Sequence, residues 1–497
     1  MVFNTASGQL RTRPLRRREA VAGLCMAWVL GGCAALRPVA PVEPQADVPH
    51  AWSTALGDSG ALPEARSTVA WWQHFNDPLL TSLVTQALQA NTSVLGAQAA
   101  LRQARALRDA TAAGLQPQLT GSGSAQHGTS GGSSTGNVFR AGLDARWELD
   151  LFGAQRSALA TSEATARASA ASLGDVQVSV AAEVALAYIG LRSTQARLAI
   201  ARDNLASQLQ TLQITDWRAQ AGLSSALQVQ QARAASAQTQ AQLPALQSTI
   251  AQAAHALAVL TGQAPGALAG LLATPAAVPQ PGSELALSLP AETLRQRADV
   301  RAAELQVLAA SARVAQADAA RYPSFSLGGS LGLSALTLGS LTRGAAVAST
   351  LLAGISLPVW DGGAAQAQVQ AQQAALDQAR SAYRGVVLGA LKDVEDALVA
   401  LRDDRERHAR LLQAAQAATA AATLSQHRYS AGLIDFQTVL DTQRSQLATQ
   451  DSLAGAQADL SADQVRLFKA LGGGWTPNDG MAVPPPERAG TSQTVTR

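Results

Sequence analysis

The chain repeats itself over a long distance, and this repeat limits the folds that it can adopt. Residues 91–117 match residues 297–323 at a constant offset of 206 positions (297 − 91 and 323 − 117). Residues 218–223 match residues 428–433, with the same Ala-Gly-Leu ending, at an offset of 210 positions (428 − 218). Because collinear matches at such a spacing indicate duplicated structural units, we expect two repeats of one plan.

Each half contains two segments in which apolar and polar residues alternate, as they do in a β-strand with two different faces. The alternation is strict in residues 138–149, clear in 324–334, softer in 347–359 and weakest in 118–127. Runs rich in Gly, Ser and Thr separate the two segments of each pair and favour turns. The pattern therefore predicts one β-hairpin per half, at residues 117–150 and 323–359.

Two other segments lack proline and have helical patterning throughout, at residues 154–220 and 364–430. At about 1.5 Å per residue, each helix would be on the order of 100 Å long. An Ala-Gly-Leu turn and a return helix follow, which predicts long helical hairpins at 154–260 and 363–471. Their surfaces mix Ala, Gln, Ser and Thr with apolar residues, as expected for helices that line a water-filled tube. A soluble coiled-coil rod is the alternative.

The composition excludes several classes of function. Aromatic residues make up 4% of the chain and charged residues 15%, which suits closely packed helices and not the core of an ordinary globular enzyme. The net charge is +3 and basic residues are spread along the chain, so we expect no nucleic-acid partner. The six histidines are scattered, and no nucleophile, metal or phosphate motif is present. We therefore expect neither an enzyme nor a metal site.

The N-terminus has the features of a bacterial lipoprotein signal. A basic region precedes an apolar run at residues 20–30, which is too short to span a bilayer. The run ends in Leu-Gly-Gly-Cys33-Ala34, which predicts a signal peptide at 1–32, a lipid on Cys33, and an extended tether at 33–70. Ala34 after the cysteine favours the outer membrane. The alternative is an ordinary signal peptide with a chance cysteine. Elsewhere no stretch of 18 residues is apolar throughout, so we expect no transmembrane helix.

Strands of about ten residues with one apolar and one polar face are typical of outer-membrane barrels. A soluble sandwich strand shows the same alternation, but the lipoprotein signal favours the barrel. Aromatic residues also cluster near the hairpin ends, where an interfacial girdle would lie: Trp147, Phe152, Tyr322, Phe325 and Trp360. Four strands cannot close a membrane barrel, so we expect an oligomer, and three copies would supply twelve strands.

Several motifs together resemble those of the outer-membrane efflux factors of the TolC and OprM type, in the NodT-like lipoprotein branch. The resemblance covers about residues 33–475. The motifs that carry it lie at Trp71–Leu79, Trp147–Gly153, Arg297–Val300, Leu357–Gly363 and Ala470–Trp475.

The resemblance implies a homotrimer in which a twelve-stranded β-barrel, with four strands per chain, continues into a twelve-helix periplasmic α-barrel. It also implies a passive exit duct in the outer membrane of a Gram-negative bacterium. Its partners would be a periplasmic adaptor, an inner-membrane RND-type pump and outer-membrane lipids, and no cofactor is implied besides the lipid on Cys33. A lipoprotein coiled-coil scaffold without channel activity is the alternative.

The matches also predict domain boundaries. The first repeat covers 71–270, a linker 271–290 and the second repeat 291–475, and we expect residues 476–497 to form a disordered tail.

The resemblance places the periplasmic aperture after the second helical turn. The Leu-Asp-Thr-Gln-Arg motif implies that Asp441 and Arg444 narrow the pore there, with Gln437 beside them. Gln437 replaces a leucine that is frequent in relatives, and Gln228 replaces the usual aspartate of the first turn. We therefore expect a looser lock between the hairpins. Ala298 replaces the family's proline, and we expect only a local change at a helix start.

The two helical turns are the surfaces that the resemblance assigns to the adaptor. The predicted contact residues are Arg218, Gly222, Leu223, Arg428, Tyr429, Gly432 and Leu433. For the nearby Asp435 we expect a helix-capping role instead of a place in the pore.

Overall fold

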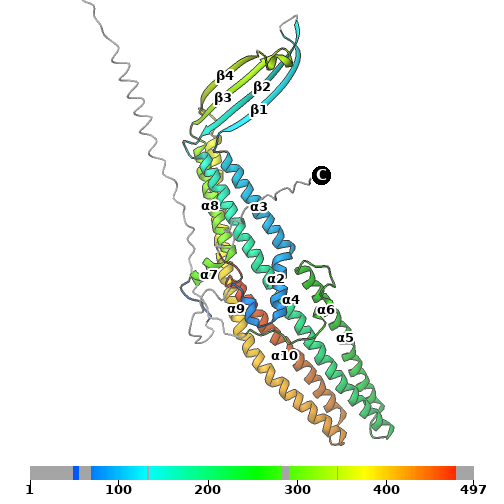
Figure 1. Cartoon of the computed structure of the whole chain (residues 1–497). Coiled ribbons are helices and arrows are strands. Elements are labelled where there is room, and N and C mark those ends of the chain that lie inside the picture. The colour runs from blue at the N-terminus through cyan, green and yellow to red at the C-terminus, as the bar shows by residue number, and fades with distance from the viewer. Residues whose placement is uncertain (1–48, 55–68, 131–133, 282–289, 344, 477–497) are drawn as a thin grey trace, which may run out of the picture. The chain divides into compact units, whose positions relative to one another are not determined.

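The computed structural model describes residues 49–54, 69–130, 134–281, 290–343 and 345–476 (Figure 1). The elements are η3 (Trp71–Phe75), α2 (Pro78–Ala90), α3 (Thr92–Ala113), β1 (Gln118–Ser130), β2 (Ser134–Leu149), α4 (Ala154–Gln220), α5 (Ala226–Leu260), α6 (Ala269–Leu272), α7 (Pro290–Gln296), α8 (Ala298–Ala319), β3 (Ser324–Ala335), η4 (Leu338–Leu341), β4 (Ala346–Ser356), α9 (Ala364–Ser430) and α10 (Phe436–Ala470). The predicted signal peptide, Cys33, most of the tether and residues 477–497 lie outside the described residues.

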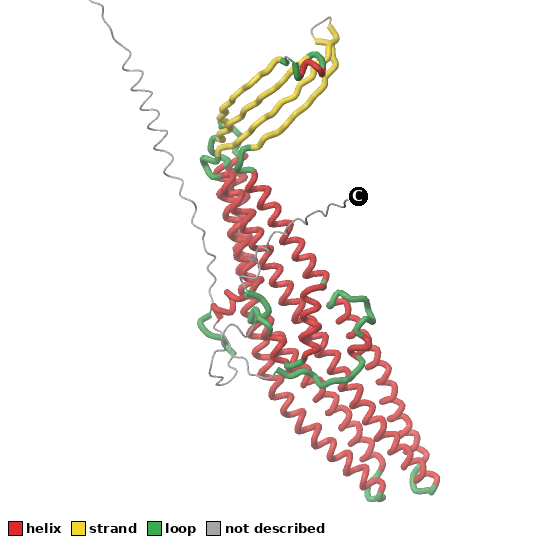
Figure 2. The backbone as a smooth tube through the Cα atoms, viewed as in Figure 1, coloured by secondary structure: helices red, strands yellow, loops and turns green. Residues whose placement is uncertain are grey.

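The chain forms two compact units. The described part of one consists of residues 117–157 and 314–369 and contains the four strands. The other contains most of the helical residues. In this second unit, α4 runs beside α5 and α9 runs beside α10, as Figure 2 shows.

The two halves match in element length. The helices α3 and α8 each have 22 residues, α4 and α9 each have 67, and α5 and α10 each have 35. The long helices α4 and α9 begin and end at the predicted residues. Their C-terminal ends are set by Gly222 and Gly432, whose φ values of 76° and 75° end a helix and favour glycine.

The repeat extends to individual contacts. In the first half, the Asn91 amide donates a hydrogen bond to the backbone oxygen of Leu260 at 2.9 Å. At the matching position in the second half, the Arg297 guanidinium donates to the backbone oxygen of Ala470 at 3.0 Å. Each contact ties the start of one helix (α3 or α8) to the end of a return helix (α5 or α10), so different side chains fulfil one structural role.

The four strands form one antiparallel sheet in the order β1-β2-β3-β4. The register sets Trp147 of β2 opposite Leu327 of β3, and Asp144 opposite Ser330. Like residues therefore share a face across the sheet, as the alternation predicts. The predicted segment 347–359, where the alternation is softer, forms a shorter strand that ends at Ser356, because Pro358 cannot donate a hydrogen bond to the ladder.

The sequence predicts no transmembrane helix after the signal peptide, and among the described residues α4 alone meets the length and composition criteria for one. This helix contains a stretch of 18 residues that is long and apolar enough to cross a membrane by length and composition, and 44% of that stretch is buried. The apolar side chains between Val180 and Leu191 pack in the largest cluster of buried residues.

The core of the helical unit is built around the Trp71-Trp72 motif. Trp71 is fully buried and stacks on Phe468 of α10, with ring centres 5.5 Å apart and planes at 16°. Tyr188 of α4 is buried in the same cluster and donates a hydrogen bond to Asp77, which caps α2. This cluster holds the N-terminal helices against the two long hairpins.

Candidate functional site

The sheet has one apolar and one polar face. The apolar face carries Leu143 and Trp147 of β2, Leu327 and Leu331 of β3, and Val347, Leu351 and Ile355 of β4. Leu351 is 80% exposed in a single chain. A band of exposed aliphatic residues along adjacent strands is typical of a surface that contacts lipid or another protein.

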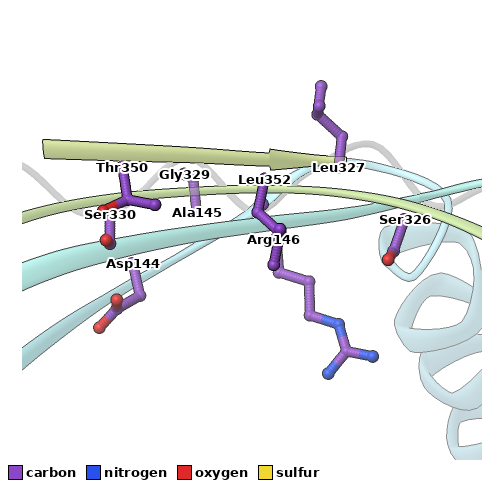
Figure 3. Close-up of a pocket in the computed structure, with 10 residues that line it drawn as sticks. Asp144, Ala145, Arg146, Ser326, Leu327, Gly329, Ser330, Thr350 and Leu352 are labelled. Atoms are coloured by element: carbon purple, nitrogen blue, oxygen red, sulfur yellow. The ribbon is translucent and has the colours of Figure 1, made fainter. Parts of the chain in front are cut away.

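The polar face carries charged residues on β2 and mostly small residues on its neighbours, with the exposed Leu352 of β4 as an apolar exception. A hollow of about 350 Å³ lies over this face. In Figure 3 the side chains of Asp144 and Arg146 project to one side of the sheet together with Ser330, and Leu327 projects to the other. Small residues opposite the charges, such as Gly328 across from Arg146, keep this face open. It can therefore line an aqueous space.

The two helical turns are built alike. At each turn, the backbone N–H of the leucine after the glycine donates to the backbone carbonyl oxygen of an arginine. Leu223 donates to Arg218 at 2.7 Å, and Leu433 donates to Arg428 at 2.8 Å. These bonds close the last turn of α4 and of α9 in the same way. Leu223 and Leu433 are 70% and 73% exposed, so both present apolar side chains at the tips.

Arg218 and Tyr429, both predicted to contact an adaptor, contact one another within the single chain. The Arg218 guanidinium donates to the backbone oxygen of Tyr429 at 2.7 Å. The Tyr429 hydroxyl lies 3.2 Å from the hydroxyl of Thr215 of α4, and its side chain is buried. The two residues therefore join the tips of the two hairpins, whereas Arg428 is exposed.

The start of α10 brings together the three residues assigned to the aperture. Gln437 donates a hydrogen bond to the Asp441 carboxylate at 3.0 Å, and Arg444 lies 3.9 Å from the same oxygen. Asp435 is the N-cap of the helix and accepts from the backbone N–H of Thr438 at 2.8 Å. Hydrogen bonds from Thr438 hold the pKa of the Asp435 carboxyl below its usual range.

Gln228, the other departure from the family pattern, also caps a helix. Its amide oxygen accepts from the backbone N–H of Ser225 at 3.1 Å, and the Ser225 hydroxyl accepts from the N–H of Gln228 at 3.4 Å. This reciprocal pair is a capping box, which gives hydrogen-bond partners to two backbone N–H groups at the start of α5. The structure thus gives Gln228 a role at the first turn, within its own hairpin.

The contact between the hairpins is polar along much of its length, which the sequence did not predict. The Gln443 amide of α10 donates to the Thr211 hydroxyl of α4 at 2.8 Å, and Arg197 of α4 binds both oxygens of Asp451 of α10 at 2.6 and 3.0 Å. Buried polar side chains of α4 on this seam are Asn204, Gln208, Thr211 and Thr215. Such residues give no periodic apolar signal, so only the paired helices reveal the seam.

Within the part of the chain that the structure describes, no three His, Cys, Asp or Glu side chains are grouped so that they could hold a metal ion.

Comparison with known proteins decides the family. The profile of the family described as "Outer membrane efflux protein" matches residues 83–263 and 289–473. The chain belongs to this family. Its members are efflux channel proteins, and the chain is accordingly an outer-membrane efflux channel with their repeated fold. The resemblance seen in the sequence motifs is thereby confirmed.

Individual relatives align with most of the length of this chain. It is 33% identical to the pyoverdine export outer membrane protein OpmQ of Pseudomonas putida over 441 residues, which span 86% of this chain and 92% of that protein. It is 30% identical to nodulation protein T of Rhizobium leguminosarum bv. viciae over 82% of this chain and 84% of that one. The solved structure of the outer-membrane channel OprN matches with 36% identity and a TM-score of 0.79, over 88% of this chain and 99% of that chain.

Proposed function

We propose that three copies of this chain close a twelve-stranded barrel in the outer membrane and form the exit duct of a tripartite efflux system. A periplasmic adaptor and an inner-membrane RND-type pump would deliver the substrates. The chain has no phosphate-binding motif, so the duct is passive and the pump supplies the energy.

The observation that carries this proposal is the sheet. It has an apolar face with Leu351 and Ile355 strongly exposed, and a polar face with Asp144 and Arg146. Its outer strands β1 and β4 each pair on one side only within the described residues. Open strand edges in lipid would leave backbone groups without partners. Pairing β4 of one copy with β1 of the next removes these edges and places the polar face inward.

The helical tips support the second part of the proposal. Leu223 and Leu433 present exposed apolar side chains next to Arg428, which suits a protein partner such as an adaptor. Asp441, with Gln437 and Arg444, would lie at the periplasmic aperture, where three copies form a ring of carboxylates. We propose in addition that lipid on Cys33 anchors each chain to the membrane.

Conductance and mass together test the proposal. The purified protein in detergent should have the mass of a trimer, and in planar lipid bilayers it should produce discrete, long-lived current steps. A matched variant with Leu351→Asp and Ile355→Asp places charges on the face assigned to lipid and should abolish insertion. A stable folded monomer, or a trimer that never conducts, would favour the coiled-coil scaffold instead.

A further inference from the structure

The second helical hairpin buries an acidic side chain that neither the aperture nor the tips use. Asp463 of α10 is only 1% exposed. Its Oδ1 accepts a hydrogen bond from Arg466 at 2.5 Å, whereas its buried Oδ2 has no hydrogen-bond partner among the described residues. An ionised carboxylate oxygen without a donor is costly in a protein interior. The site therefore favours a proton on Asp463.

A second carboxylate faces Asp463 from α9. Arg407 of α9 donates to Asp459 of α10 at 3.1 Å, which sets an antiparallel register that places Asp404 opposite Asp463. No hydrogen bond joins the two carboxyl groups within the described residues, but Asp404 is one of the groups that raise the pKa of Asp463. Two carboxylates offer only acceptors, so a hydrogen bond between them requires that one holds a proton.

Within the part of the chain that the structure describes, two arginines bind the carboxyl groups of the pair. Arg466 on α10 binds Asp463, and Arg407 on α9 binds Asp404 at 3.2 Å. Arg407 also reaches α10, where it donates to Asp459.

The other elements packed on this part of α10 bring neutral groups. Gln280, in the segment after α6, donates to the Ser461 hydroxyl at 2.7 Å. The α4 helix packs there against Val465 in the apolar cluster. The ion pair that α4 does form with α10, between Arg197 and Asp451, lies about three helical turns from Asp463.

We propose that Asp463 and Asp404 form a proton-binding site that ties α9 to α10 when it is occupied. With the proton bound, the Asp463 hydroxyl donates to the Asp404 carboxylate across the hairpin. When the proton leaves to water, two anions face each other. Among the described residues, Arg466 is the one cation that binds Asp463 directly, and the hairpin loosens at this point. The inference concerns the packing of one hairpin and does not depend on the proposed channel function.

The direction of the pH dependence follows from linkage. Burial raises the pKa of Asp463 from 3.8 to about 6, with Asp404 adding to the rise and Arg466 opposing it. A carboxyl with a raised pKa keeps its proton in the closed hairpin at pH values where the opened hairpin has released it. The stabilisation is fully present below 3.8 and is lost as the pH rises through about 6.

Hydrogen exchange of the assembled protein in detergent tests this site. After correction for intrinsic exchange rates, local opening of α10 around Asp463 should increase about tenfold between about pH 5 and about pH 7.5. Asp463→Asn should remove this dependence. Asp404→Asn, at a more exposed position, should weaken it, because Arg466 then faces Asp463 without the second carboxylate.

Asp459→Asn is the matched control, since Asp459 binds Arg407 in the same cluster but does not face Asp463. This variant should keep the tenfold change. The proposal is overturned if exchange in the parent does not depend on pH, or if Asp463→Asn and Asp404→Asn both keep the full pH dependence. It is also overturned if Asp459→Asn loses the pH dependence as completely as Asp463→Asn does.

Discussion

Arg218, near the end of α4, donates a hydrogen bond to the backbone oxygen of Tyr429, near the end of α9, over 2.7 Å. The same guanidinium lies 4.7 Å from the centre of the Tyr429 ring. The acceptor is one of the last carbonyls of α9, where the helix dipole places partial negative charge. These contacts join the tips of the two hairpins. A partner that displaces the first hairpin would therefore also strain or break its contact with the second.

Removal of this arginine should loosen the tips. Arg218→Ala loses a charge-assisted hydrogen bond and a cation–π contact, which together contribute about 2 kcal/mol at a half-buried site. We expect faster hydrogen exchange at residues 427–433 and faster proteolysis at the turns. Arg428→Ala changes an exposed arginine on the same turn and should leave the exchange rates nearly as in the parent. Equal exchange in both variants would show that Arg218 does not join the hairpins.

The glycines that follow the return helices should tolerate no side chain. A Cβ on Gly262, whose φ is 72°, would meet the backbone oxygen of Ala90. Gly262→Ala should therefore destabilise the protein by at least about 2 kcal/mol. Gly190→Ala is the control, because a Cβ there meets no atom within 4 Å on a helical surface, and it should stabilise by about 0.5–1 kcal/mol. Thermal unfolding in detergent compares them, and similar midpoints for the two variants would contradict the close approach.

Lipid on Cys33 can be detected directly. Metabolic labelling with a fatty acid should mark the parent and leave Cys33→Ser unmarked. Because the sheet would also span the membrane, we expect the variant to remain in the membrane fraction. Equal labelling of the parent and the variant would refute the anchor, and release of the variant into the soluble fraction would contradict the barrel.

The bounds of the long helices and the two faces of the sheet were predictable because short-range signals determine them. Gly222 ends a helix through its own backbone preference, and strict alternation along β2 sets which side chains share a face. The capping role of Asp435 was predictable for the same reason, since it depends on residues within one turn.

The polar seam and the buried carboxyl pair were not predictable, because they depend on which helices meet. Gln443 and Thr211 are 232 residues apart, and each would be an ordinary surface residue on an isolated helix. Asp463 is buried by elements that lie far from it in the sequence, which its own neighbours along the chain do not indicate. Tyr429 likewise is buried against α4, which its position at the end of α9 does not indicate.

The last prediction concerns the aperture. If three copies of Asp441 surround the axis there, their charge should favour cations over anions. Asp441→Asn removes the charge with little change in volume, and the amide can still accept a hydrogen bond from Gln437. Cation selectivity in single-channel recordings should fall, most clearly at low salt, where screening is weakest. Asp435→Asn should leave selectivity almost unchanged, because asparagine caps a helix as well as aspartate does. If Asp435→Asn alters selectivity more than Asp441→Asn, or if neither alters it, the ring of charge that controls entry is not formed by Asp441.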